Sequence, residues 1–129
     1  MSEEDLTEAG GPARKGIDFT YEVSYVNHRF ATRLKGETPE PWPDNGWMVA
    51  PDEYRTKESA IRYFTESIDE MIAAWQAVPA DEIFKVISLP TGETSPLDLA
   101  YSCCEHGNYH NGQLNYIQEL GGDMTVHWQ

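Results

Sequence analysis

A proline-rich stretch near the middle of the chain limits what the chain can fold into. Residues 37–54 contain four prolines, and proline within a helix removes a backbone hydrogen bond and clashes with the preceding turn. Long helices are therefore expected only on either side of this stretch. An irregular loop of this length is uncommon and often functional. We expect Trp42, Trp47 and Met48 to hold it against the rest of the protein.

Three long helices are predicted around this loop. The first covers residues 17–35 and ends near Gly36, although its first half also alternates like a strand. The second covers residues 56–77, with Thr56 as its N-cap. Its apolar stripe has helical spacing and consists of Ile61, Phe64, Ile68, Met71, Ile72 and Trp75.

The third helix is the most clearly delimited. Ser95 is the predicted N-cap, Pro96 takes the first helical position, and the helix extends to residue 120. Gly107 and Gly112 weaken its interior, which suggests a packing or functional reason for them. Between the second and third helices, residues 85–89 are β-prone and are followed by a predicted turn at residues 90–92. The expected fold class is all-α.

The 129 residues suit a single domain. We expect an acidic, flexible N-terminus over residues 1–15, because Gly10, Gly11 and Pro12 interrupt any helix there. The helical domain is predicted over residues 16–122. A C-terminal tail over residues 123–129 contains His127, which we expect to be exposed and inert.

The charge balance excludes some classes of partner. The chain has 22 acidic residues against 9 lysines and arginines, a formal net charge of −13, so it repels nucleic-acid phosphates and anionic membranes. No apolar run approaches the length of a membrane span, and the first residues do not resemble a signal peptide. The adjacent Cys103 and Cys104 are a poor disulfide framework, so a reducing cytoplasm is the expected compartment.

A pair of histidines carries the main chemical signal. His106 and His110 stand four residues apart, which places both side chains on one face of a helix, one turn from each other. Two imidazoles so placed can bind one metal ion, and His28 is the other histidine inside a predicted helix. The alternative is that these histidines are solvated or satisfied within the core, and the spacing alone does not separate the two interpretations.

Neighbouring residues carry further alternatives. Glu105 is either an acid or base beside the site or a solvated surface residue. Gln113 follows His110 by three residues, so it either approaches the metal or makes a structural hydrogen bond. Cys103 is either a soft ligand or a small buried side chain.

The last helix resembles the C-terminal signature of the DinB-like superfamily, a group of small bacterial helical bundles. The residues that carry the resemblance are His106, His110, the run Gly112-Gln113-Leu114, and the closing Gly121-Gly122. His28, ahead of Gly36 and Glu37, matches the position of the family's earlier histidine. The resemblance implies a divalent metal, zinc or nickel, held by His28, His106 and His110. It also implies metal-assisted thiol transfer or related hydrolase or isomerase chemistry on a low-molecular-weight thiol or other small molecule.

The chain departs from the usual four-helix bundle of that superfamily. A helix normally precedes the one that carries the first histidine, and here only about sixteen residues stand before it. The expected fold is therefore a DinB-like bundle with three long helices, whose uncovered apolar face favours a homodimer. The long loop covering that face is the competing expectation, and truncation of a longer chain is another. The alternative function is a non-catalytic metal-binding or dimeric interaction module.

Overall fold

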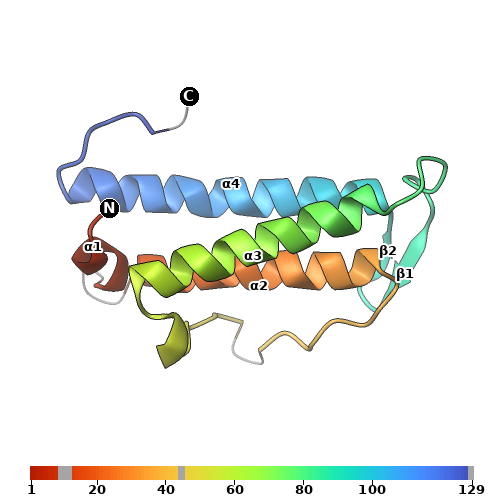
Figure 1. Cartoon of the computed structure of the whole chain (residues 1–129), viewed down its shortest axis with the longest axis horizontal. Helices are drawn as coiled ribbons and strands as arrows, with labels where there is room; N and C mark the ends of the chain where they lie inside the picture. The colour runs from red at the N-terminus through yellow and green to blue at the C-terminus, as the bar shows by residue number, and fades with distance from the viewer. Residues whose placement is uncertain (9–12, 44–45, 128–129) are drawn as a thin grey trace.

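Three long helices dominate the structure, a computed structural model that describes residues 1–8, 13–43 and 46–127. They are α2 (Gly16–Leu34), α3 (Lys57–Gln76) and α4 (Pro96–Leu120). α2 packs against both of the others, and α3 crosses it obliquely (Figure 1). The expectation of a mainly helical fold with three long helices is confirmed. Among the described helices, none is both long and apolar enough to cross a membrane.

Local capping explains where α3 and α4 begin. The Thr56 hydroxyl accepts a hydrogen bond from the Ser59 backbone, and the Ser59 hydroxyl bonds back to the Thr56 backbone. The Ser95 hydroxyl accepts from the Asp98 backbone N–H at 3.2 Å. These contacts satisfy donors that the first turn of a helix leaves free. They agree with the N-caps predicted at both positions.

A short helix precedes the bundle, where the sequence predicted only a flexible segment. α1 (Glu3–Thr7) is capped reciprocally by Ser2 and Asp5. Its Leu6 is buried in a cluster with Ile17 and Ala60. These residues therefore form a capped helical turn with one buried leucine, which the sequence did not lead us to expect. Gly10, Gly11 and Pro12, on which that prediction depended, lie outside the described residues.

A small hairpin connects α3 to α4. β1 (Ile87–Leu89) pairs antiparallel with β2 (Gly92–Thr94), and Leu89 lies opposite Gly92. The predicted β-prone segment is therefore a strand, and the predicted turn follows it. The sequence reasoning missed β2, a strand of only three residues that forms by pairing with β1.

The proline-rich loop, which includes the 3-10 turn η1 (Asp52–Tyr54), packs along α2. The Ala50 backbone donates to the Asp18 carboxylate at 2.8 Å, and the Tyr25 hydroxyl donates to the Pro41 carbonyl at 2.9 Å. Met48 is buried, as predicted, whereas Trp47 is 64% exposed. Trp42 is half-buried and its ring meets the Tyr25 ring of α2 edge-on, with the centroids 6.0 Å apart, so it contacts the bundle as predicted.

A polar chain crosses all three long helices. The Cys103 thiol of α4 donates to the Asn27 side chain of α2 at 3.0 Å, and the Asn27 amide donates to the Ser67 hydroxyl of α3 at 3.1 Å. Burial raises the pKa of Cys103 to about 11, so the thiol stays protonated and available as a donor. Cys103 is therefore a half-buried packing residue at the helix contact, close to the second of its two predicted roles.

The buried face of α3 is rotated relative to the predicted stripe. Ala60, Ser67, Met71 and Ala74 are buried. By contrast, Ile61, Phe64 and Ile72 are 57%, 38% and 48% exposed. Small residues therefore face α2, which allows the two helices to approach closely, and half of the predicted apolar stripe lies to one side of the contact.

Candidate metal centre

Two histidines of α4 meet a glutamate of α2 inside the bundle. His106 and His110 have their Nε2 atoms 3.2 Å apart. The Glu22 Oε1 atom lies 3.5 Å from the first and 3.4 Å from the second. Three donor atoms on two helices thus form a nearly equilateral triangle. In the part of the chain that the structure describes, this is the one cluster with the spacing of a metal site.

The dimensions of the triangle fit a metal ion. A tetrahedral zinc ion with bonds of about 2.0–2.1 Å requires its donor atoms to lie about 3.3 Å apart. The three observed separations lie close to that value. Three ligands of this type, two imidazoles and one carboxylate, leave a tetrahedral ion one open position.

The surroundings of His110 fix its orientation. The imidazole is 2% exposed and stacks on the Phe19 ring, with the ring centroids 5.4 Å apart. Its Nδ1 lies 2.7 Å from the Gln113 carbonyl oxygen, which can only accept a hydrogen bond. The proton of the neutral ring is therefore on Nδ1, and the Nε2 lone pair faces Glu22 and His106. Gln113 makes the hydrogen bond that was one of its two predicted roles.

Glu22 is held from the opposite side. Its other carboxylate oxygen forms an ion pair with the Arg14 guanidinium, which also donates to the Met48 carbonyl at 3.2 Å. The Glu22 side chain is only 9% exposed. A buried carboxylate needs such a partner, because an unpaired charge in a protein interior is costly. Arg14 leaves Oε1 free to face the histidines.

His106 is less constrained than His110. Its side chain is 24% exposed, and among the described residues its Nδ1 has no hydrogen-bond partner although the atom is buried. Burial lowers the pKa of His106, and the neighbouring His110 lowers it further, whereas Glu22 acts in the opposite direction. The net effect favours the neutral imidazole, which is the form that binds metals.

His28 does not reach this cluster, so the predicted three-histidine set is corrected. Its Nδ1 contacts the Glu70 carboxylate of α3, and its ring lies 5.1 Å from that of Tyr63. His28 follows Glu22 by six residues, which on a helix is about 9 Å along the axis and about 240° around it. The two side chains therefore leave α2 in different directions, and Glu22 takes the place predicted for His28.

The other candidates lie outside the triangle. Glu105 is exposed, consistent with a surface residue. His127 is also exposed, and its Nε2 lies 3.0 Å from an Asp123 carboxylate oxygen.

A sequence signal for Glu22 was present but was not used. Glu22 falls between Phe19 and Val26, at spacings of three and four residues, within the apolar stripe of the first helix. An acidic residue in such a stripe is buried with it and requires a partner. The sequence could have marked Glu22 as unusual, but it could not identify the side chains that face it.

Comparisons of the chain with protein-family models, with curated proteins and with solved structures found no match. The interpretation of the site therefore depends on its geometry and on the chemistry of its side chains.

Proposed function

We propose that this protein binds one divalent transition-metal ion at Glu22, His106 and His110. The observation that carries the proposal is the triangle of donor atoms, with separations of 3.2, 3.4 and 3.5 Å. Two imidazole Nε2 atoms at 3.2 Å need either a shared proton or a common metal ion between them, because two lone pairs repel. Zinc and nickel remain the leading candidates, because both accept imidazole ligands.

The proposed site is of the catalytic rather than the closed structural type. Structural zinc sites use four protein ligands, whereas two histidines and one glutamate leave a position for water or substrate. A metal held this way acidifies bound water or stabilises a bound thiolate. The hydrogen bond from His110 to Gln113 orients the ring, and the Arg14 ion pair orients Glu22. This arrangement supports metal-assisted thiol transfer or a related hydrolase or isomerase reaction, as the DinB-like resemblance suggested.

The competing explanation is a hydrogen-bonded trio without metal. In that case one Nε2 proton of His106 is shared with His110 or Glu22, and the site only links α4 to α2. A non-catalytic metal-binding module is the second alternative. It is favoured if the ion acquires a fourth protein ligand, and an exchangeable water on the ion favours an enzyme.

Elemental analysis and zinc titration of the untagged protein test the proposal. We expect one zinc or nickel per chain. His110→Ala and Glu22→Gln should each weaken zinc binding by at least about tenfold, since loss of ligands or of their supporting residues costs that much or more. His28→Ala is the matched control, because it removes a histidine from α2 outside the triangle, and it should leave zinc affinity unchanged.

Two outcomes would contradict the proposal. If no divalent metal binds with a dissociation constant in the micromolar range or below, the site is the metal-free trio instead. A loss of zinc binding in His28→Ala equal to that in Glu22→Gln would restore the three-histidine site. Circular dichroism of each variant separates a lost ligand from a lost fold.

A further inference from the structure

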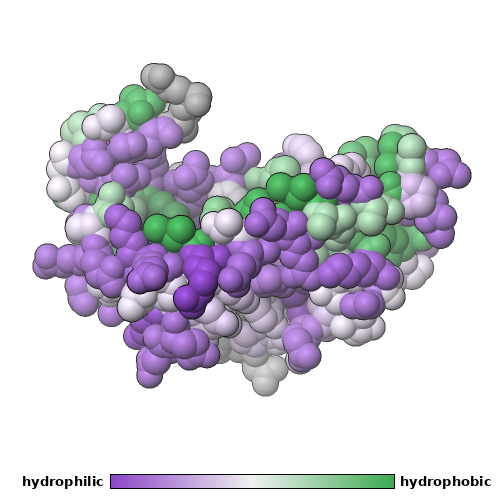
Figure 2. Space-filling model, viewed as in Figure 1, coloured by the Kyte–Doolittle hydropathy of each residue, from purple (hydrophilic) through white to green (hydrophobic). Residues whose placement is uncertain are grey.

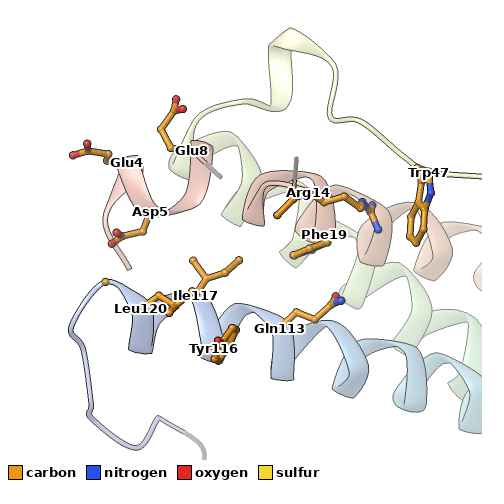
Figure 3. A pocket seen from close by; sticks show the side chains of 12 residues that line it. Glu4, Asp5, Glu8, Arg14, Phe19, Trp47, Gln113, Tyr116, Ile117 and Leu120 are labelled. Atoms are coloured by element: carbon orange, nitrogen blue, oxygen red, sulfur yellow. The ribbon is translucent and has the colours of Figure 1, made fainter. Parts of the chain in front are cut away.

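An open pocket lies directly beside the proposed metal centre. It has a volume of about 1060 Å³ and lies between α1, the start of α2 and the last turns of α4 (Figure 3). Sites for small molecules usually enclose about 300–1,000 Å³ and have mainly apolar walls. The apolar walls here come from Phe19, Trp47, Tyr116, Ile117 and Leu120.

Three residues belong both to the pocket wall and to the support of the metal centre. Phe19 stacks on His110, Gln113 hydrogen-bonds to His110, and Arg14 pairs with Glu22. All three line the pocket. A molecule in the pocket therefore lies one side chain away from the proposed ligands.

Arg14 supplies a polar group at the inner end of the pocket. Its guanidinium lies over the rings of Phe19 and Trp47, 4.8 Å from each centroid. Within the described residues, its buried Nε has no hydrogen-bond partner. Glu22 already balances the charge of this guanidinium, so the inner end of the pocket becomes net positive only when the proposed divalent ion is also bound.

The opposite end of the pocket has the opposite charge. Glu4, Asp5 and Glu8 of the α1 region line it, and Figure 3 shows them away from Arg14. Like charges repel, so an anionic group is disfavoured at this end and favoured at the inner end, where Arg14 and the proposed ion together outweigh the single charge of Glu22. The electrostatics therefore give the ligand a direction, with its acidic head inward and an uncharged or basic tail outward.

The wall residues are also unusually exposed for their size. Trp47, Tyr116 and Leu120 are 64%, 62% and 70% exposed, and they converge on the same pocket. Adjacent exposed apolar side chains generally mark a binding surface.

We infer that this pocket binds a small arylalkyl carboxylate-like molecule, with the aromatic body against Tyr116 and Leu120 and the acidic head at Arg14. The inference rests on the proposed function for the charge that attracts that head, because the bound ion makes the inner end of the pocket net positive. It names the class of substrate on which such a centre would act.

The probes are 4-phenylbutyrate and butyrate, titrated into zinc-loaded full-length protein by calorimetry. They share the carboxylate head and differ in the phenyl group. Burying a phenyl group should strengthen binding by at least about tenfold, given the usual gain per area of apolar surface. A third probe, 4-(4-carboxyphenyl)butyrate, adds a tail carboxylate and should bind more weakly than 4-phenylbutyrate.

Two tyrosines of α4 provide matched variants. Tyr116→Ala removes a pocket wall, and Tyr101→Ala removes an equally exposed tyrosine elsewhere on α4. Because both side chains are more than 60% exposed, neither change should unfold the protein. We expect Tyr116→Ala to remove most of the preference for 4-phenylbutyrate, and Tyr101→Ala to retain it.

The same titrations on metal-free protein separate this inference from the metal proposal. If the protein fails to bind added zinc and still prefers 4-phenylbutyrate to butyrate, the apolar part of the pocket inference stands and the metal centre is rejected. Zinc binding with equal affinity for the two probes, or with no binding of either, overturns the pocket inference and leaves the metal centre intact. Equal losses in both tyrosine variants also overturn it.

Discussion

At the scale of single residues, the properties of the proposed centre depend on the protonation of two imidazoles. His110 has its Nδ1 proton directed at Gln113, and burial favours the neutral form of His106. The two Nε2 atoms face each other, and a metal ion binds them only when they carry no proton. Glu22, held by Arg14, adds a negative charge that partly balances a divalent cation.

Zinc affinity should therefore depend on pH through these two rings. Protons compete for a histidine nitrogen near and below its reference pKa of about 6.5, by up to about tenfold per pH unit for each ring. Because the pKa of His106 is lowered, its competition begins at more acidic pH than for a free histidine. We expect constant affinity above neutrality and a progressive loss on acidification, measured by competition with a chelator of known pH dependence.

Glu22→Gln is the control for this measurement. It retains both imidazoles, so its weaker zinc binding should still fall on acidification, beginning at a more acidic pH because Glu22 no longer raises the pKa of His106. Affinity that stays flat from pH 7.5 to 5.5, which spans about one unit on either side of the reference histidine pKa, would argue against histidine ligands.

The same shift in His106 affects the stability of the metal-free protein. A group whose pKa is lower in the folded state stabilises the fold above its unfolded pKa, and the contribution is lost as the pH falls. Metal-free protein should therefore lose stability to urea as the pH falls below about 6.5, the ordinary histidine pKa. That part of the loss should be absent in His106→Asn.

The histidine pair was predictable from the sequence and the third donor was not. Spacing within one helix is a local property, so His106 and His110 were assigned to a common face without knowledge of the fold. The partner from α2 depends on which face of that helix meets α4. His28 lies on a different face, toward Glu70 and Tyr63 of α3. Its place in a predicted helix and the family resemblance had favoured it over Glu22.

At the scale of elements, the ends of the helices were predictable because local residues set them. The predicted third helix, residues 96–120, coincides with α4, and the other two differ by one residue at each end. The buried face of α3 was not predictable in the same way. Apolar periodicity selected Ile61 and Ile72, whereas α2 packs against Ala60 and Ala74, where small side chains permit a close approach.

The glycines inside α4 give a prediction at this scale. A Cβ atom added at Gly107 or Gly112 would have no neighbour within 4 Å. Packing against the described residues therefore does not require glycine at either position. Gly107→Ala and Gly112→Ala should each raise the free energy of unfolding by roughly 0.5–1 kcal/mol, because alanine loses less backbone entropy in a helix. Urea denaturation of metal-free protein measures the change.

Zinc affinity provides the second readout for these variants. Neither glycine supplies a donor atom, so both variants should bind zinc as the original protein does. A variant that is less stable, or that loses zinc binding, would contradict this prediction. It would show that another group occupies the space beside that glycine, and that glycine is retained there for function.

At the scale of the whole molecule, the exposed apolar stripe of α3 is unexpected for a monomer. Ile61, Phe64 and Ile72 are at least 38% exposed along one helix. Figure 2 shows hydrophobic residues emerging from a largely hydrophilic surface along the line where α3 passes α4. The proline-rich loop was the competing candidate to cover such a face, but it packs along α2 through Asp18 and Tyr25.

Self-association through this stripe is the resulting prediction, with a two-fold homodimer as the simplest closed form. The formal net charge of −13 opposes the contact of two identical chains, and salt screens that repulsion. The dimer should therefore strengthen as ionic strength rises, and sedimentation equilibrium at low and moderate salt measures this.

The double variant Ile61→Gln/Ile72→Gln should be monomeric, since it removes apolar area that a partner would bury. Val86→Gln changes a similarly exposed side chain off α3 and should dimerise normally. A monomer at every salt concentration, or equal behaviour of the two variants, would mean that α3 is stable with its apolar stripe in water.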